Sequence, residues 1–378
     1  MQRITNAKVY MGGNWVGTLA LYENVVAFEY SKEWLANGFS ISPFSLPLKK
    51  RVFMPKPHPF DGLFGVFSDT LPDGWGRLLL DRMLRNNGED PGALTPIERL
   101  CIVGSTGMGA LEYVPEVQLS SATALTNFDE LARECAKVLE EKDTDDLDKL
   151  FKMGGSSGGA RPKVFTTIDG RPWIVKFRSS IDDKNAGKME YDYARCAAAC
   201  GIDVPNVALL PSNECAGYFA VERFDRVQSV NGALERIHMA SASALLETSH
   251  RLPNLDYAQL MKLVSIITHN NMNEIKKMYR LMCFNVFAHN RDDHSKNFTF
   301  LYNQANNEWA LSPAYDLTYS NSLGGQHATT VAGNGENPGI EDILQVARGT
   351  DLDASWAHDE AKRIQSIVQE QLGEYLTR

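Results

Sequence analysis

The chain has 378 residues, a formal net charge of −9 and 43% hydrophobic residues. This length and apolar content are enough to bury one large core or two smaller ones, and they argue against global disorder. The acidic balance argues against direct nucleic-acid binding, which usually needs a basic face. One basic stretch, residues 46–59, departs from this balance, and we interpret it as a solvated loop.

The N-terminus lacks the basic start and continuous apolar run of a signal peptide, and no segment has the apolar length of a membrane-spanning helix. We therefore expect a soluble, cytoplasmic protein with no membrane partner. The six cysteines are scattered and form no CxxC pair. In a reducing cytosol we expect them to be buried free thiols, without the ligand cluster of a zinc site.

Short strands are predicted over residues 1–45. Residues 7–13 and 14–23 alternate around Gly-Gly and Asn turns, as in a hairpin. A helix is expected next, with Asp69 or Thr70 as its N-cap. The apolar face of this helix carries Trp75, Leu78, Leu79 and Met83.

The middle of the chain combines helical and strand patterns. Residues 126–151 are predicted to be helical, with Thr126 or Asn127 as the N-cap. Two strands are predicted around a turn at Asp169-Gly170, followed by a helix that stops at Gly201. Two more strands come next, and from about residue 233 the pattern predicts helices almost throughout.

A glycine-rich turn precedes the Asp169 hairpin. It consists of Gly154, Gly155, Ser156, Ser157, Gly158 and Gly159. Glycine lets backbone amides approach a phosphate closely. The turn matches neither GxxxxGK[ST] nor GxGxxG, so a flexible linker before a strand remains an equal alternative at this point.

Lys176 lies in the apolar strand that follows this turn. Burying a charged lysine costs free energy unless an anion pairs with its ammonium group. A strand lysine beyond a glycine-rich loop resembles the phosphate-contacting lysine of protein kinases, and Glu190 in the next helix is a possible partner. The alternative is a lysine at a strand edge with its ammonium in water.

The stretch HNRDDHSKNF, residues 289–298, follows a predicted helix and combines an aspartate with an asparagine five positions later. Asp292 is the candidate base that orients or deprotonates a hydroxyl nucleophile. Asn297 and Asp316, which lies beyond a predicted hairpin, are candidate oxygen ligands for Mg²⁺. Asp293 is the less favoured base because its offset to Asn297 is four.

The order of these parts favours a kinase, because a glycine loop, a strand lysine, a helix glutamate, the Asp-x4-Asn loop and a final aspartate follow one another. The chain resembles the HipA-like serine/threonine kinases, the toxins of bacterial toxin–antitoxin pairs. The resemblance covers nearly the whole chain and rests on GALEYVP, GGARPK, WIVKF, AVERFDR, DDHSKNF and SPAYDLT in this order. The last three are the most specific.

The resemblance implies a role for each matching position. Asp292 corresponds to the catalytic base, and Asn297 and Asp316 to the magnesium ligands. The implied ATP-binding positions are Gly158, Gly159, Ala160, Arg161, Pro162, Lys163, Lys176, Glu222, Arg223, Phe224, His294, Ser295, Lys296, Asn297, Tyr315 and Asp316. Among them, Glu222 and Phe224 match the hinge that holds adenine. Family members can phosphorylate a serine before the glycine loop, which corresponds here to Ser156, with Ser157 as the near alternative.

The resemblance also implies partners and an architecture. The family's substrates are proteins such as aminoacyl-tRNA synthetases, and its partner is a small HipB-like DNA-binding antitoxin, so DNA is contacted only indirectly. The implied fold is α+β and two-lobed, with a β-rich small lobe and a mostly helical large lobe. The expected divisions are residues 1–115, an N-terminal HipA-like subdomain, residues 116–222, the small lobe, and residues 223–378, the large lobe.

Two other functions remain open. A small-molecule kinase of the aminoglycoside or choline type shares the Asp-x4-Asn loop, but it usually has histidine two positions before the aspartate, where this chain has Asn290. A catalytically silent antitoxin-binding module would be free to lose Asp292, Asn297, Asp316 and Lys176, and all four are present.

Overall fold

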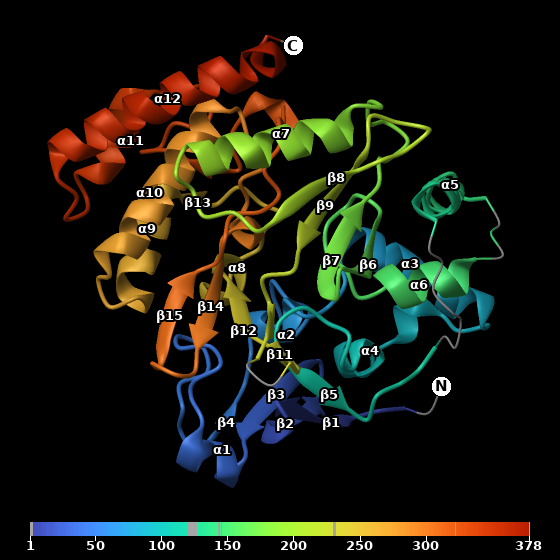
Figure 1. Ribbon diagram of the computed structural model, residues 1–378. Coiled ribbons are helices and arrows are strands. Elements are labelled where there is room, and N and C mark those ends of the chain that lie inside the picture. Colours follow the sequence, from blue (N-terminus) through green and yellow to red (C-terminus); the bar gives the residue numbers. More distant parts are fainter. Residues whose placement is uncertain are drawn as a thin grey trace. The chain divides into compact units, whose positions relative to one another are not determined.

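The computed structural model describes residues 3–119, 127–142, 144, 146–229, 232–321 and 323–377 (Figure 1). The chain divides into two compact units. The first unit contains residues 1–187, 208–240 and 244–247, and the second contains residues 188–207, 241–243 and 248–378. The chain therefore passes between the units five times, after Gly187, Val207, Ala240, Ser243 and Glu247.

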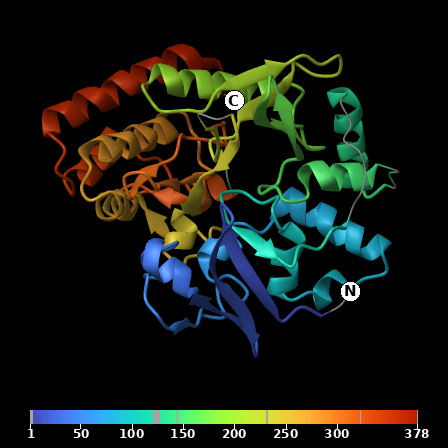
Figure 2. The same cartoon turned by 60° about the horizontal axis from the view of Figure 1, so that its bottom comes forward.

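The first unit begins with a five-stranded sheet in the order β4-β3-β2-β1-β5. Its strands are β1 (Asn6–Met11), β2 (Asn14–Tyr22), β3 (Val25–Tyr30), β4 (Val52–Phe53) and β5 (Glu112–Val114). The predicted β1–β2 hairpin is confirmed, and Val9, Met11 and Leu19 are buried on one face of it. The blue strands of this sheet come forward in Figure 2.

Seven helical segments precede the second sheet in the described part of the first unit. They are α1 (Lys32–Asn37), α2 (Gly65–Ser68), α3 (Gly74–Asn86), the 3-10 turn η1 (Pro91–Ala93), α4 (Pro96–Val103), α5 (Phe128–Leu139) and α6 (Leu147–Gly154). Asn127 caps α5 as predicted, whereas Thr126 lies outside the described residues. The predicted single run over residues 126–151 is in fact two helices, α5 and α6.

Both predicted N-caps of α3, Asp69 and Thr70, were wrong. Asp69 follows α2 as its C-cap, and α3 begins only at Gly74, with Asp73 at the N-cap. Pro72 explains the break, because a proline disfavours helical conformation in the residue before it. The predicted apolar face of α3 is confirmed, since Trp75, Leu79 and Met83 are buried.

A second sheet in the order β6-β7-β9-β8 follows, with β6 (Lys163–Ile168), β7 (Arg171–Lys176), β8 (Val207–Leu210) and β9 (Tyr218–Glu222). The predicted β6–β7 hairpin is confirmed. Asp169 and Gly170 at its turn have φ of 50° and 76°. Two consecutive positive φ values suit a tight hairpin turn, which explains why this sequence signal was reliable.

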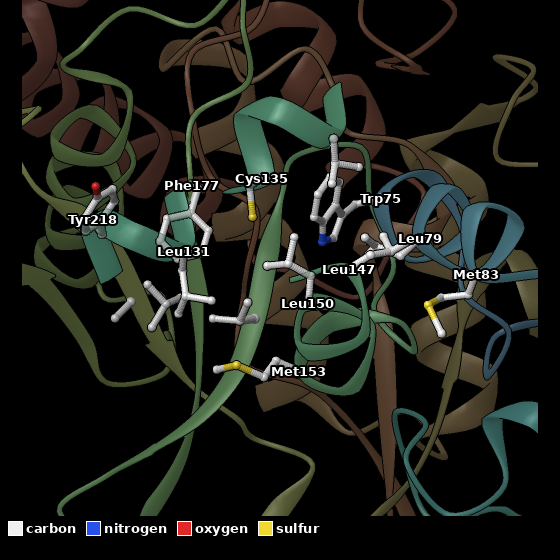
Figure 3. Packing of buried hydrophobic residues seen from close by; sticks show 14 residues of the cluster. Trp75, Leu79, Met83, Leu131, Cys135, Leu147, Leu150, Met153, Phe177 and Tyr218 are labelled. Atoms are coloured by element: carbon white, nitrogen blue, oxygen red, sulfur yellow. The ribbon is translucent and has the colours of Figure 1, made fainter. Parts of the chain in front are cut away.

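One hydrophobic cluster joins α3, α5 and α6 to this sheet (Figure 3). Its members are Trp75, Leu79, Met83, Leu131, Cys135, Val138, Leu147, Leu150, Met153, Val164, Val175, Phe177, Tyr218 and Ala220. The described part of the first unit also contains β10 (Arg226–Gln228), β11 (Leu234–Arg236) and most of β12 (His238–Ser241).

The second unit is mainly helical. It contains most of α7 (Ala186–Ala199), α9 (Tyr257–Ile267), α10 (Met272–Phe287), α11 (Ile340–Ala347) and α12 (Ala354–Leu376), and α10 packs against α9 and α12. The apolar residues expected on α10, namely Ile275, Met278, Met282 and Val286, are all buried. The short helix α8 (Ala242–Leu245) begins in this unit.

The expectation of helices almost throughout beyond residue 233 was wrong. That region also contains β11, β12, β13 (Leu255–Asp256), β14 (Thr299–Asn303), β15 (Glu308–Leu311) and β16 (Thr329–Thr330), with 3-10 turns η2 (Ser295–Asn297) and η3 (Leu323–Gly325). Such short strands give little periodic signal, because their pairing depends on distant partners such as β13 with β16. The predicted β14–β15 hairpin is confirmed.

All six cysteines are free, and only Cys215 is not fully buried. Within the described residues, no helix is both long enough and apolar enough to span a bilayer.

Candidate functional site

The candidate residues divide between the two units. The glycine-rich turn, Lys163, Lys176 and residues 222–224 belong to the first unit. Glu190, the Asp292 loop and Asp316 belong to the second. The expected pairing of Lys176 with Glu190 therefore involves both units and stays a prediction.

The two serines of the glycine-rich turn have different environments. Ser157 is 1% exposed, and its Oγ donates a hydrogen bond to Gly154 O at 2.5 Å. Ser156 is half-buried, and its Oγ donates to Thr106 O at 3.1 Å. The Ser157 hydroxyl is thus held inside the turn, whereas the Ser156 hydroxyl lies closer to its surface.

The glycines of this turn allow close packing against the start of α3. Trp75 N donates to Gly159 O at 2.9 Å. A Cβ atom on Gly76 would lie 2.3 Å from Ser157 O, and one on Gly74 would lie 2.4 Å from Gly159 O. The glycine-rich segment therefore packs closely against the start of α3, which does not fit a flexible linker.

Two lysines face each other at the base of the β6–β7 hairpin. Lys163 opens β6 and is directly opposite Lys176, the last residue of β7. Lys163 is 7% exposed, and its Nζ would lie 2.6 Å from a Cβ atom on Gly159. Like charges directly opposite on one sheet face repel each other, so an anion that contacted both ammonium groups would relieve this repulsion.

Other residues of the predicted ATP loop have structural contacts. Arg161 forms an ion pair with Asp182, with Nε and Nη2 at 3.1 and 3.2 Å from its carboxylate oxygens. Burial raises the pKa of Asp182, but the Ser179 amide and Arg161 outweigh it and lower this pKa overall. Pro162 O accepts from Phe177 N at 2.8 Å, which joins the end of the turn to the end of β7.

The predicted adenine hinge lies at the end of β9. Arg223 N donates to Pro172 O in β7 at 2.9 Å. Because a trans peptide points its N–H and C=O in opposite directions, the Glu222 carbonyl points away from β7. The Arg223 guanidinium bonds to the buried Asp225 carboxylate at 2.9 and 2.8 Å. Arg223 therefore anchors the segment through its backbone N–H and its guanidinium. The Glu222 carbonyl is the backbone group of this segment that points away from β7.

Asp292 lies in a turn after α10. Helix α10 ends at Phe287, and Asn290 Nδ2 bonds back to Asn285 Oδ1 at 2.9 Å. His289 has a φ of 51°, a left-handed conformation that is uncommon outside glycine. After this turn the Asp292 side chain is 64% exposed, and His294 Nε2 lies 3.9 Å from its Oδ1. An exposed carboxylate can approach a hydroxyl nucleophile.

Asp293 has the opposite environment. It is 1% exposed and accepts hydrogen bonds from Tyr257 Oη at 2.8 Å and His327 Nδ1 at 2.9 Å. Thr329 N adds a third bond at 3.1 Å. This buried carboxylate fixes the backbone beside Asp292. Tyr257 and His327 were missed in the sequence, because they lie 36 and 34 residues from Asp293 and form no local motif.

The metal-ligand candidates are connected to the same loop. Asn297 Nδ2 donates to Asp292 O at 2.8 Å, which leaves the amide Oδ1 to act as a ligand. Tyr315 Oη donates to Lys296 O, so the segment before Asp316 is joined to η2. Asp316 itself has a φ of 54°. An amide oxygen and a carboxylate are hard ligands that fit Mg²⁺, which takes few ligands from protein. Among the described residues, no cluster of three or more His, Cys, Asp or Glu could hold a metal ion.

Comparison with known proteins gives matches over both parts of the chain. The sequence model of the HipA-like C-terminal domain matches residues 155–375, and that of the HipA N-terminal domain matches residues 7–114. A Sinorhizobium fredii protein named "Putative kinase Y4mE" is 27% identical over 328 residues, which cover 77% of this chain and 71% of that protein.

A solved structure is similar over almost the whole chain. It is the complex of HipA, HipB and operator DNA from the Shewanella oneidensis MR-1 toxin–antitoxin system. The match has a TM-score of 0.67 and 19% sequence identity, and it covers 97% of each chain. This similarity confirms the expected α+β, HipA-like fold.

Proposed function

The chain belongs to the HipA family, and from this premise we propose that it is an ATP- and Mg²⁺-dependent serine/threonine protein kinase. The observation that carries the proposal is the Asp292 loop, in which an exposed carboxylate lies five residues before an asparagine whose amide is bonded to Asp292 O. The name of the Sinorhizobium relative also supports a kinase.

In the proposed reaction, Asp292 accepts the proton of a serine or threonine hydroxyl. The hydroxyl oxygen forms a bond to the γ-phosphorus of ATP, the bond to the β,γ-bridging oxygen breaks, and ADP leaves with that electron pair. Asn297 Oδ1 and the Asp316 carboxylate would hold Mg²⁺, which neutralises charge on the phosphates when bound.

The remaining ATP contacts are proposed by position. Residues 158–163 would cover the phosphates, and Lys176 would pair with them, as the facing Lys163 and Lys176 support. Residues 222–224 would hold adenine, for which the direction of the Glu222 carbonyl is suitable. Residues 294–296 and Tyr315 would complete the nucleotide site.

We further propose Ser156 as the autophosphorylation site, in preference to Ser157. Ser157 is buried and bonded within its turn, whereas Ser156 is half-buried. A phosphorylated Ser156 could no longer donate to Thr106 O, and it would bring nearly two negative charges to that carbonyl. Phosphorylation would therefore displace the turn and switch off ATP binding.

The proposed biological role is that of a toxin in a toxin–antitoxin pair. The Shewanella HipA structure contains HipB and operator DNA, which supports a HipB-like, DNA-binding antitoxin as the partner here. The proposed substrate is a translation component such as an aminoacyl-tRNA synthetase, whose modification would halt growth and favour persistence. The proposed location is the cytoplasm. We keep the division at residues 1–115, 116–222 and 223–378 as part of this proposal.

The proposal is tested with labelled ATP on chain that has first been treated with a phosphatase. Wild type should label itself at Ser156, and Asp292→Asn should lower the rate by roughly 100- to 10,000-fold. Asp359→Asn is the matched control, because Asp359 is another exposed carboxylate beside a histidine, at 3.2 Å. Full labelling of Asp292→Asn would contradict the proposed base.

The acceptor is identified in the same assay with a panel of synthetases and a panel of small alcohols. Label on a synthetase supports the protein kinase. Label on a small alcohol alone would replace it with the small-molecule kinase, and no transfer to any acceptor would favour a silent antitoxin-binding module.

A further inference from the structure

Asp73 has an unusual role for a residue at a helix N-cap. An aspartate at this position normally accepts a hydrogen bond from an amide in the first turn of its own helix. Asp73 makes no such bond to α3. Its Oδ1 instead accepts a hydrogen bond from Gly159 N, 86 residues further along the chain.

Hydrogen bonds run in both directions between the start of α3 and the glycine-rich turn. Gly159 O accepts from Trp75 N at 2.9 Å, so the glycine-rich turn supplies an acceptor for the first turn of α3. Gly74 has a φ of 43°, and its Cα lies so close to Gly159 that a Cβ atom would meet the Gly159 carbonyl at 2.4 Å. The helix start and the turn therefore complete each other's hydrogen bonds at Gly159.

This contact joins the two family domains within the first unit. Asp73 lies in the part that matches the HipA N-terminal domain, and Gly159 lies in the part that matches the C-terminal domain. Trp75 reinforces the junction, because its Nε1 donates to Lys163 O at 3.2 Å just beyond the turn. Moving the end of the turn would break its bonds at Gly159 and disturb the bond at Lys163.

We propose that Asp73 is a positioning residue that holds the glycine-rich turn in its phosphate-binding conformation. The inference rests on the proposed function, since it takes residues 158–163 as the part that covers the phosphates of ATP. The Asp73 carboxylate has no contact with the reacting atoms in this role. It acts by restricting the Gly159 backbone before nucleotide binds, which lowers the ordering cost of binding.

Hydrogen–deuterium exchange of the nucleotide-free chain tests the tether directly. In Asp73→Ala, peptides over residues 154–161 should exchange about tenfold faster than in wild type, because a hydrogen bond to a charged acceptor is lost. Asp73→Asn retains an oxygen acceptor and should fall between the two. Asp90→Ala is the matched control, since Asp90 accepts from Gly92 N within its own turn, and it should leave residues 154–161 unchanged.

Titration with Mg²⁺·ATP gives the functional readout. Asp73→Ala should bind roughly three- to tenfold more weakly, and Asp73→Asn should recover most of the affinity. Exchange in Asp73→Ala within twofold of wild type would overturn the tether. Tighter ATP binding in Asp73→Ala would overturn the positioning role, because the carboxylate would then be a competitor of phosphate.

The two readouts separate this inference from the proposed function. Faster exchange in Asp73→Ala with no ATP binding by wild type would retain the tether and reject the nucleotide site. ATP binding by wild type, together with unchanged hydrogen exchange in Asp73→Ala, would retain the nucleotide site and reject the tether. If Asp73→Ala fails to fold, as judged by circular dichroism, the exchange of Asp73→Asn still decides, and an increase above wild type is required.

Discussion

Adjacent carboxylates can have opposite environments, as Asp292 and Asp293 illustrate. The Asp292 side chain is 64% exposed, whereas Asp293 is buried and accepts three side-chain and backbone hydrogen bonds. A buried carboxylate whose oxygens already accept hydrogen bonds is not accessible to a substrate hydroxyl. It instead fixes the backbone from which its neighbour extends.

His238 provides a residue-scale prediction about pH. Burial lowers its pKa from 6.5 to about 4, although the hydrogen bond of its Nε2 to Ile41 O, 2.8 Å long, acts in the opposite direction. Between these two pKa values the unfolded chain binds a proton that the folded chain does not. The stability contributed by neutral His238 is therefore complete above pH 6.5 and is lost as the pH falls toward 4.

Urea unfolding at pH 7.5 and pH 5 measures this loss. Wild type should lose about 2 kcal/mol more between these pH values than His238→Gln, whose side chain cannot be protonated but can still donate to Ile41 O. The exposed His58→Gln variant should show the same pH dependence as wild type. Equal slopes for wild type and His238→Gln would contradict the burial argument.

At the scale of elements, helix α3 is shaped by the turn that packs on it. Replacing a helical glycine with alanine normally stabilises a helix by about 1 kcal/mol. At Gly76, however, the added Cβ would lie 2.3 Å from Ser157 O, a backbone atom that cannot move alone. We expect Gly76→Ala to destabilise the chain by about 1–3 kcal/mol, because strain outweighs propensity.

Thermal unfolding checks this expectation against Gly373→Ala in α12. The new Cβ of that control would meet only the flexible end of Gln369, at 3.3 Å, so it should be neutral or slightly stabilising. A rise in Tm for Gly76→Ala would show that the turn accommodates the methyl group and that the packing is looser than described.

The elements differ in how well the sequence predicts them. The β6–β7 hairpin was predictable, since its Asp169-Gly170 turn is a local signal, and so was the buried face of α10. The short strands beyond residue 233 were not, because they depend on distant partners. Spacing alone was enough to propose the Asp292 loop as a candidate site. The bond from Gly159 to Asp73 and the partners of Asp293 could not, since they join residues at least 34 positions apart.

At the scale of the molecule, the N-terminal family domain supplies part of the core beneath the second sheet. Trp75, Leu79 and Met83 from α3 pack in one cluster with Val164 and Val175 of β6 and β7 (Figure 3). Deleting a single buried tryptophan side chain costs about 3–5 kcal/mol. This loss is a large fraction of the stability of an ordinary domain.

We therefore expect a chain that lacks residues 1–115 to lose its native fold. Circular dichroism should show no cooperative thermal transition, and hydrogen exchange should show little protection in β6 and β7. The full chain is the control. A truncated chain with a cooperative transition and protected β6 and β7 would mean that the small lobe is independent of the N-terminal part.

The five passages of the chain between its units also set the order in which the protein can be completed during synthesis. Residues 244–247 are the last part of the first unit along the chain, and there Glu247 Oε1 accepts a hydrogen bond from Gly65 N at 3.0 Å. At roughly 5–20 residues per second, the ribosome needs several seconds or more to proceed from the end of the N-terminal family domain to these residues. Asp292 and Asp316 follow only afterwards. A newly made chain therefore stays without Asp292 and Asp316 until its first unit can be complete. Under the proposed function, an antitoxin that recognises residues of the first unit could bind the chain before the proposed base has been synthesised.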